Sequence, residues 1–332
     1  MSGLSRSTFL GGATSAALAA RAGTLSAAER RVNNVLIEND RVLLPGWETL
    51  TDADDAGVAK TLDLVAEASK LLAAKGIGLL LVSIPFKARY STDVLPAGAI
   101  SEGVASRYAR SLQAMQARGL QTVDLDAVMR PLQTGAQTAY YPTDQHWTAP
   151  SVDAAGTAIA AAIKANWNVA ERGKRDPLPA LVVEKHVGDL ATLLPPADRA
   201  LIGSETYRLR TAYDADLTGY NMFTGAIPVA DDSPLVQVVG SSFVRPMWGL
   251  PQKISNVLGA KVGLTFFNGD VGPYHTLLMN VRSTLPQRRP NVVVWQMTEA
   301  NLHLGPAATG WWAMSALMSP DFFLTKMRDA IK

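Results

Sequence analysis

Short apolar runs alternate with amphipathic stretches along most of this chain, and this alternation limits the folds that it can adopt. The runs are rich in Val and Leu and are bounded by Gly, Pro or Asn, as buried strands are. The stretches between them repeat apolar residues at helical spacing, and two of them stop at Gly76 and Gly119. We predict strands at 78–85, 120–125, 235–239, 262–267 and 292–296, and helices at 54–74, 101–118, 149–167, 250–258 and 274–284. Strands joined through helices pair in parallel, which predicts an α/β fold: a three-layer α/β/α sandwich with a mainly parallel sheet.

One long segment, 171–229, interrupts this alternation. It is rich in Pro, Gly and Thr and has no clear helical period, which predicts an irregular insertion of turns with a small antiparallel patch. A chain of 332 residues can build one large core. We therefore predict a single domain over 23–332 that contains this insertion.

The C-terminal stretch, 308–332, is rich in aromatic residues, among them Trp311, Trp312, Phe322 and Phe323. Packing of a terminal helix against the core is the simplest explanation of such a stretch. The alternative is an aromatic platform for a sugar, and the sequence leaves both interpretations open.

The first 22 residues have the layout of a signal peptide. Arg6 precedes an uncharged run over 7–20, which is followed by the small-residue site Ala20-Arg21-Ala22. The string Ser5-Arg6-Ser7-Thr8-Phe9-Leu10 resembles a twin-arginine export box that lacks its second Arg. The run is shorter than the roughly 20 residues that span a bilayer. We expect export to the periplasm, with an uncleaved inner-membrane anchor as the alternative.

The charge balance and the absence of cysteine exclude several classes of function. Without Arg6 and Arg21 of the leader, 29 basic residues face 29 acidic ones. A neutral body without basic runs argues against nucleic acid as the main partner. The chain has no cysteine, which excludes disulfides, thiolate catalysis and Cys-based zinc sites. The four histidines are not arranged with metal-ligand spacing, so we predict no metal site and no cofactor.

Two polar motifs supply an acid, a base and a nucleophile. They are Thr143-Asp144-Gln145-His146-Trp147 and Gly240-Ser241-Ser242-Phe243, and the second follows a predicted strand. Asp144 can orient an imidazole, His146 can take and return a proton, and Ser242 can attack an acyl carbon. The carboxyl ends of parallel strands are where such sheets place their chemistry. The alternative is a loop histidine and a helix-capping serine without a catalytic role.

These motifs resemble those of the AlgX/AlgJ-type polysaccharide O-acetyltransferases, which are SGNH-hydrolase-like proteins. Residues 143–148 match a T-D-x-H-W-[NT] signature, and residues 240–243 match a G-[DST]-S-[FY] block with Ser242 at the nucleophile position. Residues 187–190 resemble the central G-D-L segment and residues 290–299 a late P-x-V-V-V-W-E strand, so that the likeness spans about 35–305. Ser241, Gln296 and Ala300 stand where Asp, Glu and Arg are common.

The resemblance implies an SGNH-hydrolase-like fold and an acetyl group carried as a serine ester. The implied acceptor is a hydroxyl of an exported polysaccharide such as alginate or cellulose. The implied donor is a membrane-bound O-acyltransferase partner, because acetyl-CoA is not expected outside the cytoplasm. An SGNH-type carbohydrate esterase with the same triad stays open, as does a non-catalytic polysaccharide-binding component of an export complex.

An acyl-transfer site also needs donors for the oxyanion. The backbone N–H of Ser242 or Phe243 is one candidate, since the turn after a strand leaves amides unpaired. The resemblance implies a second donor in the loop 268–274, from Gly272 or Tyr274. Arg245 is a candidate for holding an acidic or acyl group.

The remaining histidines are weaker candidates for the base. His275 is the main rival of His146 but lacks an acid two residues away. We expect His186 and His303 to be structural or exposed to solvent.

Overall fold

The computed structural model describes residues 31–32, 35–39, 42–134, 138–169, 178–210, 220–221, 225–226, 235–285 and 289–331. The predicted signal peptide lies outside these residues and stays a prediction. Within the described part of the chain, none of the helices combines the length and the apolar character needed to span a bilayer.

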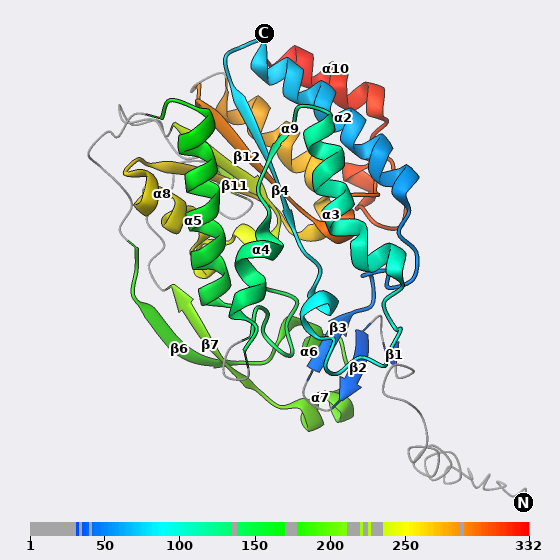
Figure 1. Ribbon diagram of the computed structural model, residues 1–332. Coiled ribbons are helices and arrows are strands. Elements are labelled where there is room, and N and C mark those ends of the chain that lie inside the picture. The colour runs from blue at the N-terminus through cyan, green and yellow to red at the C-terminus, as the bar shows by residue number, and fades with distance from the viewer. Residues whose placement is uncertain are drawn as a thin grey trace, which may run out of the picture.

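A seven-stranded sheet forms the centre of the molecule (Figure 1). Its strand order is β5-β4-β12-β10-β11-β8-β9. The strands are β4 (Gly78–Ile84), β5 (Gln121–Thr122), β8 (Tyr220–Asn221), β9 (Gly225–Ala226), β10 (Val236–Gly240), β11 (Val262–Phe266) and β12 (Val292–Thr298). All neighbours pair in parallel except β8 and β9, which pair antiparallel. The mainly parallel sheet is therefore confirmed.

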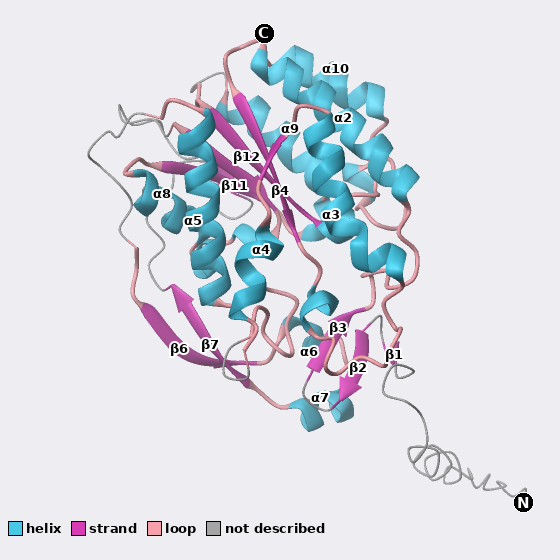
Figure 2. Ribbon diagram, in the orientation of Figure 1, coloured by secondary structure: helices cyan, strands magenta, loops and turns pink. Residues whose placement is uncertain are grey.

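Helices cover both faces of this sheet (Figure 2). One face packs against α4 (Leu125–Met129), α5 (Ala149–Asn166) and α8 (Leu250–Leu258), and the other against α2 (Asp55–Ala73), α3 (Glu102–Ala117), α9 (Pro273–Thr284) and α10 (Pro320–Ala330). Along β4, Leu80 and Val82 lie in the first core whereas Leu79 and Leu81 lie in the second. This alternation follows the two-residue period of a strand, and it confirms the three-layer α/β/α sandwich.

The strand predicted at 120–125 is shorter in the structure. It contains only Gln121–Thr122, because Asp124 caps the next helix and accepts a hydrogen bond from the backbone N–H of Ala127 at 3.0 Å. An aspartate in this position favours a helix start over a continued strand. The sequence analysis does not predict helix α4, because it extends the strand as far as residue 125.

Within its described residues, the insertion contains a small antiparallel patch, as the sequence predicts, together with two short helices that the sequence does not predict. Strands β6 (Leu181–His186) and β7 (Glu205–Arg210) form an antiparallel hairpin. The short helices α6 (Asp189–Thr192) and α7 (Pro196–Ile202) lie between these strands in the sequence. Residues 170–177, 211–219, 222–224 and 227–234 lie outside the described part of the chain.

A small antiparallel sheet near the N-terminus was not predicted. It consists of β1 (Arg31–Val32), β2 (Val35–Asn39) and β3 (Val42–Pro45). Val35 and Leu43 of this sheet share a small core with Leu190, Ala191 and Leu194 from α6 and the residues after it. The insertion and the N-terminal segment therefore pack together at the lower edge of Figure 1.

The terminal helix α10 begins after Ser319, whose hydroxyl accepts a hydrogen bond from Phe322 N. Phe323 and Met327 are buried in the second core, whereas Phe322 is half exposed. Short 3-10 turns complete the structure: Lys87–Tyr90, Arg130–Leu132, Ser242–Val244, Pro246–Trp248, Gly269–Val271, Glu299–Asn301 and Met314–Ala316.

Candidate active site

Ser242 lies at the carboxyl end of β10, where the chain turns into the 3-10 segment Ser242–Val244. Close packing beneath this turn requires Gly240, since a Cβ there would lie 2.4 Å from Gln296 Oε1. The same Gln296 oxygen accepts a hydrogen bond from Ser241 N at 2.8 Å and contacts Ser241 Oγ at 3.1 Å. The two departures from the family pattern, Ser241 and Gln296, therefore bond to each other and anchor the turn.

His146 lies in the loop ahead of α5. Tyr141 N donates to His146 O at 3.1 Å, which closes the loop into a tight turn. Beneath the loop, the buried Lys87 Nζ donates to the carbonyl oxygens of Leu43, Pro142 and Asp144 at 2.6–2.8 Å. An ammonium group has three protons to donate, and these three acceptors hold the loop in place.

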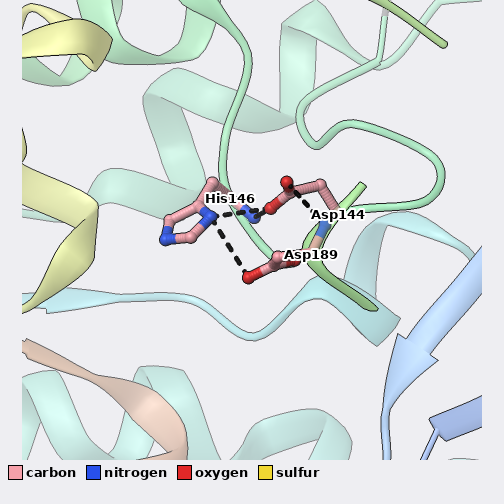
Figure 3. Close-up of side chains that lie close together, drawn as sticks. All are labelled: Asp144, His146 and Asp189. Atoms are coloured by element: carbon pink, nitrogen blue, oxygen red, sulfur yellow. Dashed lines mark hydrogen bonds and ion pairs between the residues drawn. The ribbon is translucent and has the colours of Figure 1, made fainter. Parts of the chain in front are cut away.

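The side chains of Asp144, His146 and Ser242 form a continuous chain of hydrogen bonds. His146 Nδ1 lies 2.6 Å from Asp144 Oδ1, and His146 Nε2 lies 2.8 Å from Ser242 Oγ. Asp144 and His146 are buried, whereas Ser242 is partly exposed. These distances are those of a nucleophile, its base and the acid that orients the base. Figure 3 shows the acid and the base of this arrangement.

The second carboxylate oxygen of Asp144 is also saturated. Oδ2 accepts hydrogen bonds from Tyr207 OH at 2.5 Å and from Asp189 N at 3.0 Å. Burial alone would raise the pKa of Asp144, but the hydrogen bond and charge of His146, together with these further donors, hold it well below its usual range. Asp144 therefore stays ionised and can stabilise a protonated His146.

Asp189 places a second carboxylate beside the imidazole. Figure 3 shows Asp189 beside the imidazole of His146, and its Oδ2 lies 3.5 Å from His146 Nδ1. The oxygens of Asp189 also accept hydrogen bonds from Gln145 N at 2.9 Å and Gln145 Nε2 at 2.5 Å. Burial and the nearby Asp144 raise the pKa of Asp189 to about 6, although the charge of His146 opposes this. Asp189 belongs to the G-D-L segment, to which the sequence assigned no role.

Asp144, His146 and Asp189 are also the group of described residues whose ligand atoms lie close enough for a metal ion, within 4.8 Å of one another. The hydrogen bonding favours a different use of these atoms. Both nitrogens of His146 already face Asp144 and Ser242, and both oxygens of Asp144 accept hydrogen bonds. The donor set therefore fits a proton-transfer site.

Aromatic rings fix the orientation of His146. Trp248 stacks on the imidazole with the ring centroids 4.9 Å apart, and Phe243 lies 4.8 Å away at a tilt of 52°. Trp248 Nε1 also donates to Ser242 O at 2.9 Å. Trp147 Nε1 donates to Phe243 O at 3.1 Å. These contacts restrict the ring to positions in which Nε2 faces the serine.

Ser242 opens onto a cleft of about 1140 Å³. Its walls come from the loop after β3, from α6, and from the segments that follow β10, β11 and β12. Trp47, Trp311 and Trp312 contribute aromatic surface to the cleft. The cleft lies at the carboxyl ends of the parallel strands, which is the functional edge of such sheets.

The residues predicted to bind the oxyanion or the substrate do not all lie at the cleft. Because Ser242 begins a 3-10 turn, the first amides of that turn have no acceptor within it. Gly272 N donates to Gly269 O at 3.2 Å, and Tyr274 is buried with its hydroxyl on Leu304 O at 2.9 Å. Neither Gly272 nor Tyr274 is among the residues that line the cleft: Gly272 lies against Trp312, which does line it, and Tyr274 is buried in the second core. Arg245 bonds to Asn268 Oδ1 at 2.7 Å and does not line the cleft.

The other histidines lie away from this hydrogen-bond chain. His186 Nε2 lies 2.8 Å from Glu184 Oε2 on the hairpin. His275 contacts Phe267, and burial lowers its pKa. His303 contacts Trp311 edge to face. None of these contacts involves Ser242.

Sequence reasoning missed Tyr207 and Trp248. Tyr207 lies on a strand of the insertion, and no motif near it announces a contact with Asp144. Trp248 follows Ser242 by six residues, and its position beside the nucleophile block was the only available signal.

A mainly parallel α/β/α sandwich that carries a serine, a histidine and an aspartate in one hydrogen-bond chain has the features of an SGNH hydrolase-like protein. Residues 35–299 match the family described as "SGNH hydrolase-like domain, acetyltransferase AlgX". The chain therefore belongs to this family.

Solved structures agree with this fold. The O-acetyltransferase domain of Pseudomonas putida AlgJ has a TM-score of 0.66 and 20% identity, over 89% of this chain and 99% of that chain. Pseudomonas aeruginosa AlgX has a TM-score of 0.57 and 16% identity, over 81% of this chain and 65% of that one. Bacillus cereus PatB1 has a TM-score of 0.50 and 13% identity, over 81% and 96%. No curated protein matches the sequence significantly.

Proposed function

We propose that this protein is an O-acetyltransferase that carries an acetyl group on Ser242 and passes it to a hydroxyl of an exported polysaccharide. The observation that carries the proposal is the position of His146, whose ring bridges Asp144 at 2.6 Å and Ser242 at 2.8 Å at the edge of an open cleft. A serine hydroxyl near neutral pH needs such a base to become a nucleophile.

The first half-reaction forms an acetyl-enzyme. Ser242 Oγ attacks the acetyl carbon of the donor ester while His146 Nε2 takes its proton. The resulting oxyanion is stabilised by amides at the start of the 3-10 turn. When the intermediate collapses, the donor oxygen leaves and takes the proton from His146. Ionised Asp144 stabilises the imidazolium throughout.

The second half-reaction transfers the acetyl group. A sugar hydroxyl attacks the carbonyl carbon of acetyl-Ser242 and gives its proton to His146. Ser242 Oγ leaves and recovers that proton, which restores the free enzyme. The donor partner in this proposal is a membrane-bound O-acyltransferase, and the compartment is the periplasm. The name of AlgJ as an O-acetyltransferase supports the reaction class.

Intact-protein mass spectrometry tests the proposal. The full chain is incubated with p-nitrophenyl acetate, with and without oligosaccharides. We expect an acetyl adduct on the wild type that Ser242→Ala and His146→Ala abolish or greatly reduce. Ser106→Ala, which removes an exposed hydroxyl of α3 outside the cleft lining, still forms the adduct.

The fate of the adduct separates the competing functions. An acetyl group that moves to a sugar supports the transferase, and an acetyl group lost to water at the same rate with every sugar indicates an esterase. Tight sugar binding without any adduct indicates a binding protein and would contradict the proposal.

A further inference from the structure

We infer that the acceptor is a neutral sugar chain and not a polyuronate, because the cleft at Ser242 presents four carboxylates and no Lys or Arg among its described lining residues. This inference rests on the proposed function, since it assigns the acceptor of the same serine.

The four carboxylates occupy different depths of the cleft. Asp52 and Asp270 are exposed, whereas Glu48 and Asp189 are more buried. The pKa of Glu48 is raised to about 7 by burial, against two backbone hydrogen bonds from Lys87 N at 2.8 Å and Ala88 N at 3.1 Å. Above this pH, the side chains of both Glu48 and Asp189 are charged and add to the negative charge of the cleft.

The cations near the cleft are committed elsewhere. Lys87 Nζ is buried and donates to three backbone carbonyls. Arg89 and Arg107 are buried and form ion pairs with Glu299 at 2.7 Å and 3.1 Å. Arg245 lies outside the lining and is held by Asn268 Oδ1. Lys87, Arg89 and Arg107 therefore do not offer an ammonium or guanidinium group to a sugar carboxylate, and Arg245 is not among the residues that line the cleft.

The remaining surface of the cleft suits an uncharged sugar. Trp47 and Trp311 are partly exposed and line the cleft, so that they offer flat apolar surface to the C–H face of a pyranose. Thr49, Thr298 and Asn301 add polar groups to the lining. Thr298 Oγ1 donates to Asn301 Oδ1 at 2.6 Å and Thr49 Oγ1 accepts from Arg107 at 3.1 Å, so the Thr49 O–H and the Asn301 NH2 can still donate to sugar oxygens. A polyuronate would bring a carboxylate on every unit against like charges, whereas a neutral chain would not.

The acceptor preference can be measured on the acetyl-enzyme. The wild type is acetylated with p-nitrophenyl acetate at pH 8 and low ionic strength, then given cellohexaose, xylohexaose or a mannuronate hexasaccharide. Mass spectrometry follows acetyl loss from Ser242 and its appearance on sugar. We expect at least one neutral chain to accept about tenfold faster than the uronate, and added salt to narrow the difference by screening.

A charge variant tests the cause of the preference. Asp52→Asn combined with Asp270→Asn removes the two exposed charges, and we expect the ratio of uronate to neutral acceptance to rise about threefold or more at low salt. Asp63→Asn, on the exposed surface of α2, leaves the ratio unchanged.

Three results would overturn the inference. They are a uronate accepted as fast as the neutral chains by the wild type, no neutral chain accepted, or a ratio that the double variant does not change. Failure to form acetyl-Ser242 would instead remove the proposed function itself, so the two failures are distinguishable.

Discussion

At the scale of single residues, Asp144 is the most heavily bonded group of the site. Its carboxylate accepts hydrogen bonds from His146 N, His146 Nδ1, Asp189 N and Tyr207 OH. A carboxylate with several donors keeps its charge, and a fixed charge holds the imidazole in the tautomer that faces Ser242 with a free Nε2. The acid of this site is therefore positioned by residues from three separate segments of the chain.

Asp189→Asn tests whether the second carboxylate assists the base. Because the pKa of Asp189 is raised to about 6, its side chain is charged above this pH and neutral below it. We expect Asp189→Asn to lower kcat/KM for p-nitrophenyl acetate about threefold to tenfold at pH 8, since a charge 3.5 Å from Nδ1 stabilises the imidazolium. The ratio of wild-type to variant rates should approach one as the pH falls through 6.

The same rates are measured for Asp124→Asn, where the exposed cap of α4 is replaced by an equally good cap, and this variant should match the wild type at every pH. A ratio for Asp189→Asn that is the same at pH 5 and pH 8 would show that Asp189 acts only through packing.

At the scale of elements, the insertion completes the site. Tyr207 of strand β7 donates a hydrogen bond to Asp144. Arg210, at the end of the same strand, forms an ion pair with Asp153 of α5 at 2.8 Å. Helix α6 delivers the N–H of Asp189 to the same carboxylate. The hairpin and α6 therefore attach to the sandwich at α5 and at the loop that carries Asp144 and His146.

Gly188→Ala tests this attachment. A Cβ at Gly188 would lie 2.1 Å from Thr143 O, so the backbone of α6 or of the loop that carries Asp144 and His146 must move. We expect a loss of about 1–3 kcal/mol in the free energy of unfolding, together with lower esterase activity, as measured by chemical denaturation and p-nitrophenyl acetate turnover.

The matched control is Gly103→Ala, where a Cβ in α3 would meet nothing closer than 3.7 Å. Alanine favours the helix there, so this variant should be as stable as the wild type or more so. If Gly188→Ala behaved like Gly103→Ala, the proposed attachment of α6 would be wrong.

At the scale of the whole molecule, Glu299 connects the sheet to its surroundings. It follows β12, is buried, and pairs with Arg89 of the turn Lys87–Tyr90 and Arg107 of α3. It also accepts from Phe86 N at 3.1 Å. Both charge partners of Glu299 come from segments about 200 residues away in the sequence.

Glu299→Gln would leave two buried guanidinium groups without a countercharge. Removing one partner of a buried ion pair is strongly destabilising, and we expect a loss of about 3–5 kcal/mol in the free energy of unfolding. Denaturant titration followed by tryptophan fluorescence measures this loss. Glu67→Gln, which breaks an exposed pair with Lys70, should change stability by less than about 1 kcal/mol, and equal effects of the two variants would contradict this role of Glu299.

The sequence alone determined the layers of this protein, because burial on two faces requires the apolar periods that the chain displays. The strands predicted at 78–85, 235–239, 262–267 and 292–296 correspond to β4, β10, β11 and β12. The sequence also singled out Asp144, His146 and Ser242, since their chemistry is encoded in short motifs. The structure places these three side chains in one hydrogen-bond chain.

Only the tertiary structure decided what surrounds these residues. Tyr207, Asp189 and Trp248 reach the site from the insertion and from the turn after the nucleophile, and such long-range contacts leave no periodic pattern in the sequence. Conversely, the sequence analysis names Tyr274 as a candidate oxyanion donor, yet this residue lies in helix α9 and its side chain is buried in the second core. Local spacing specifies which elements form, whereas the packing of distant elements determines which side chains meet, because contact energies depend on proximity in space and not in sequence.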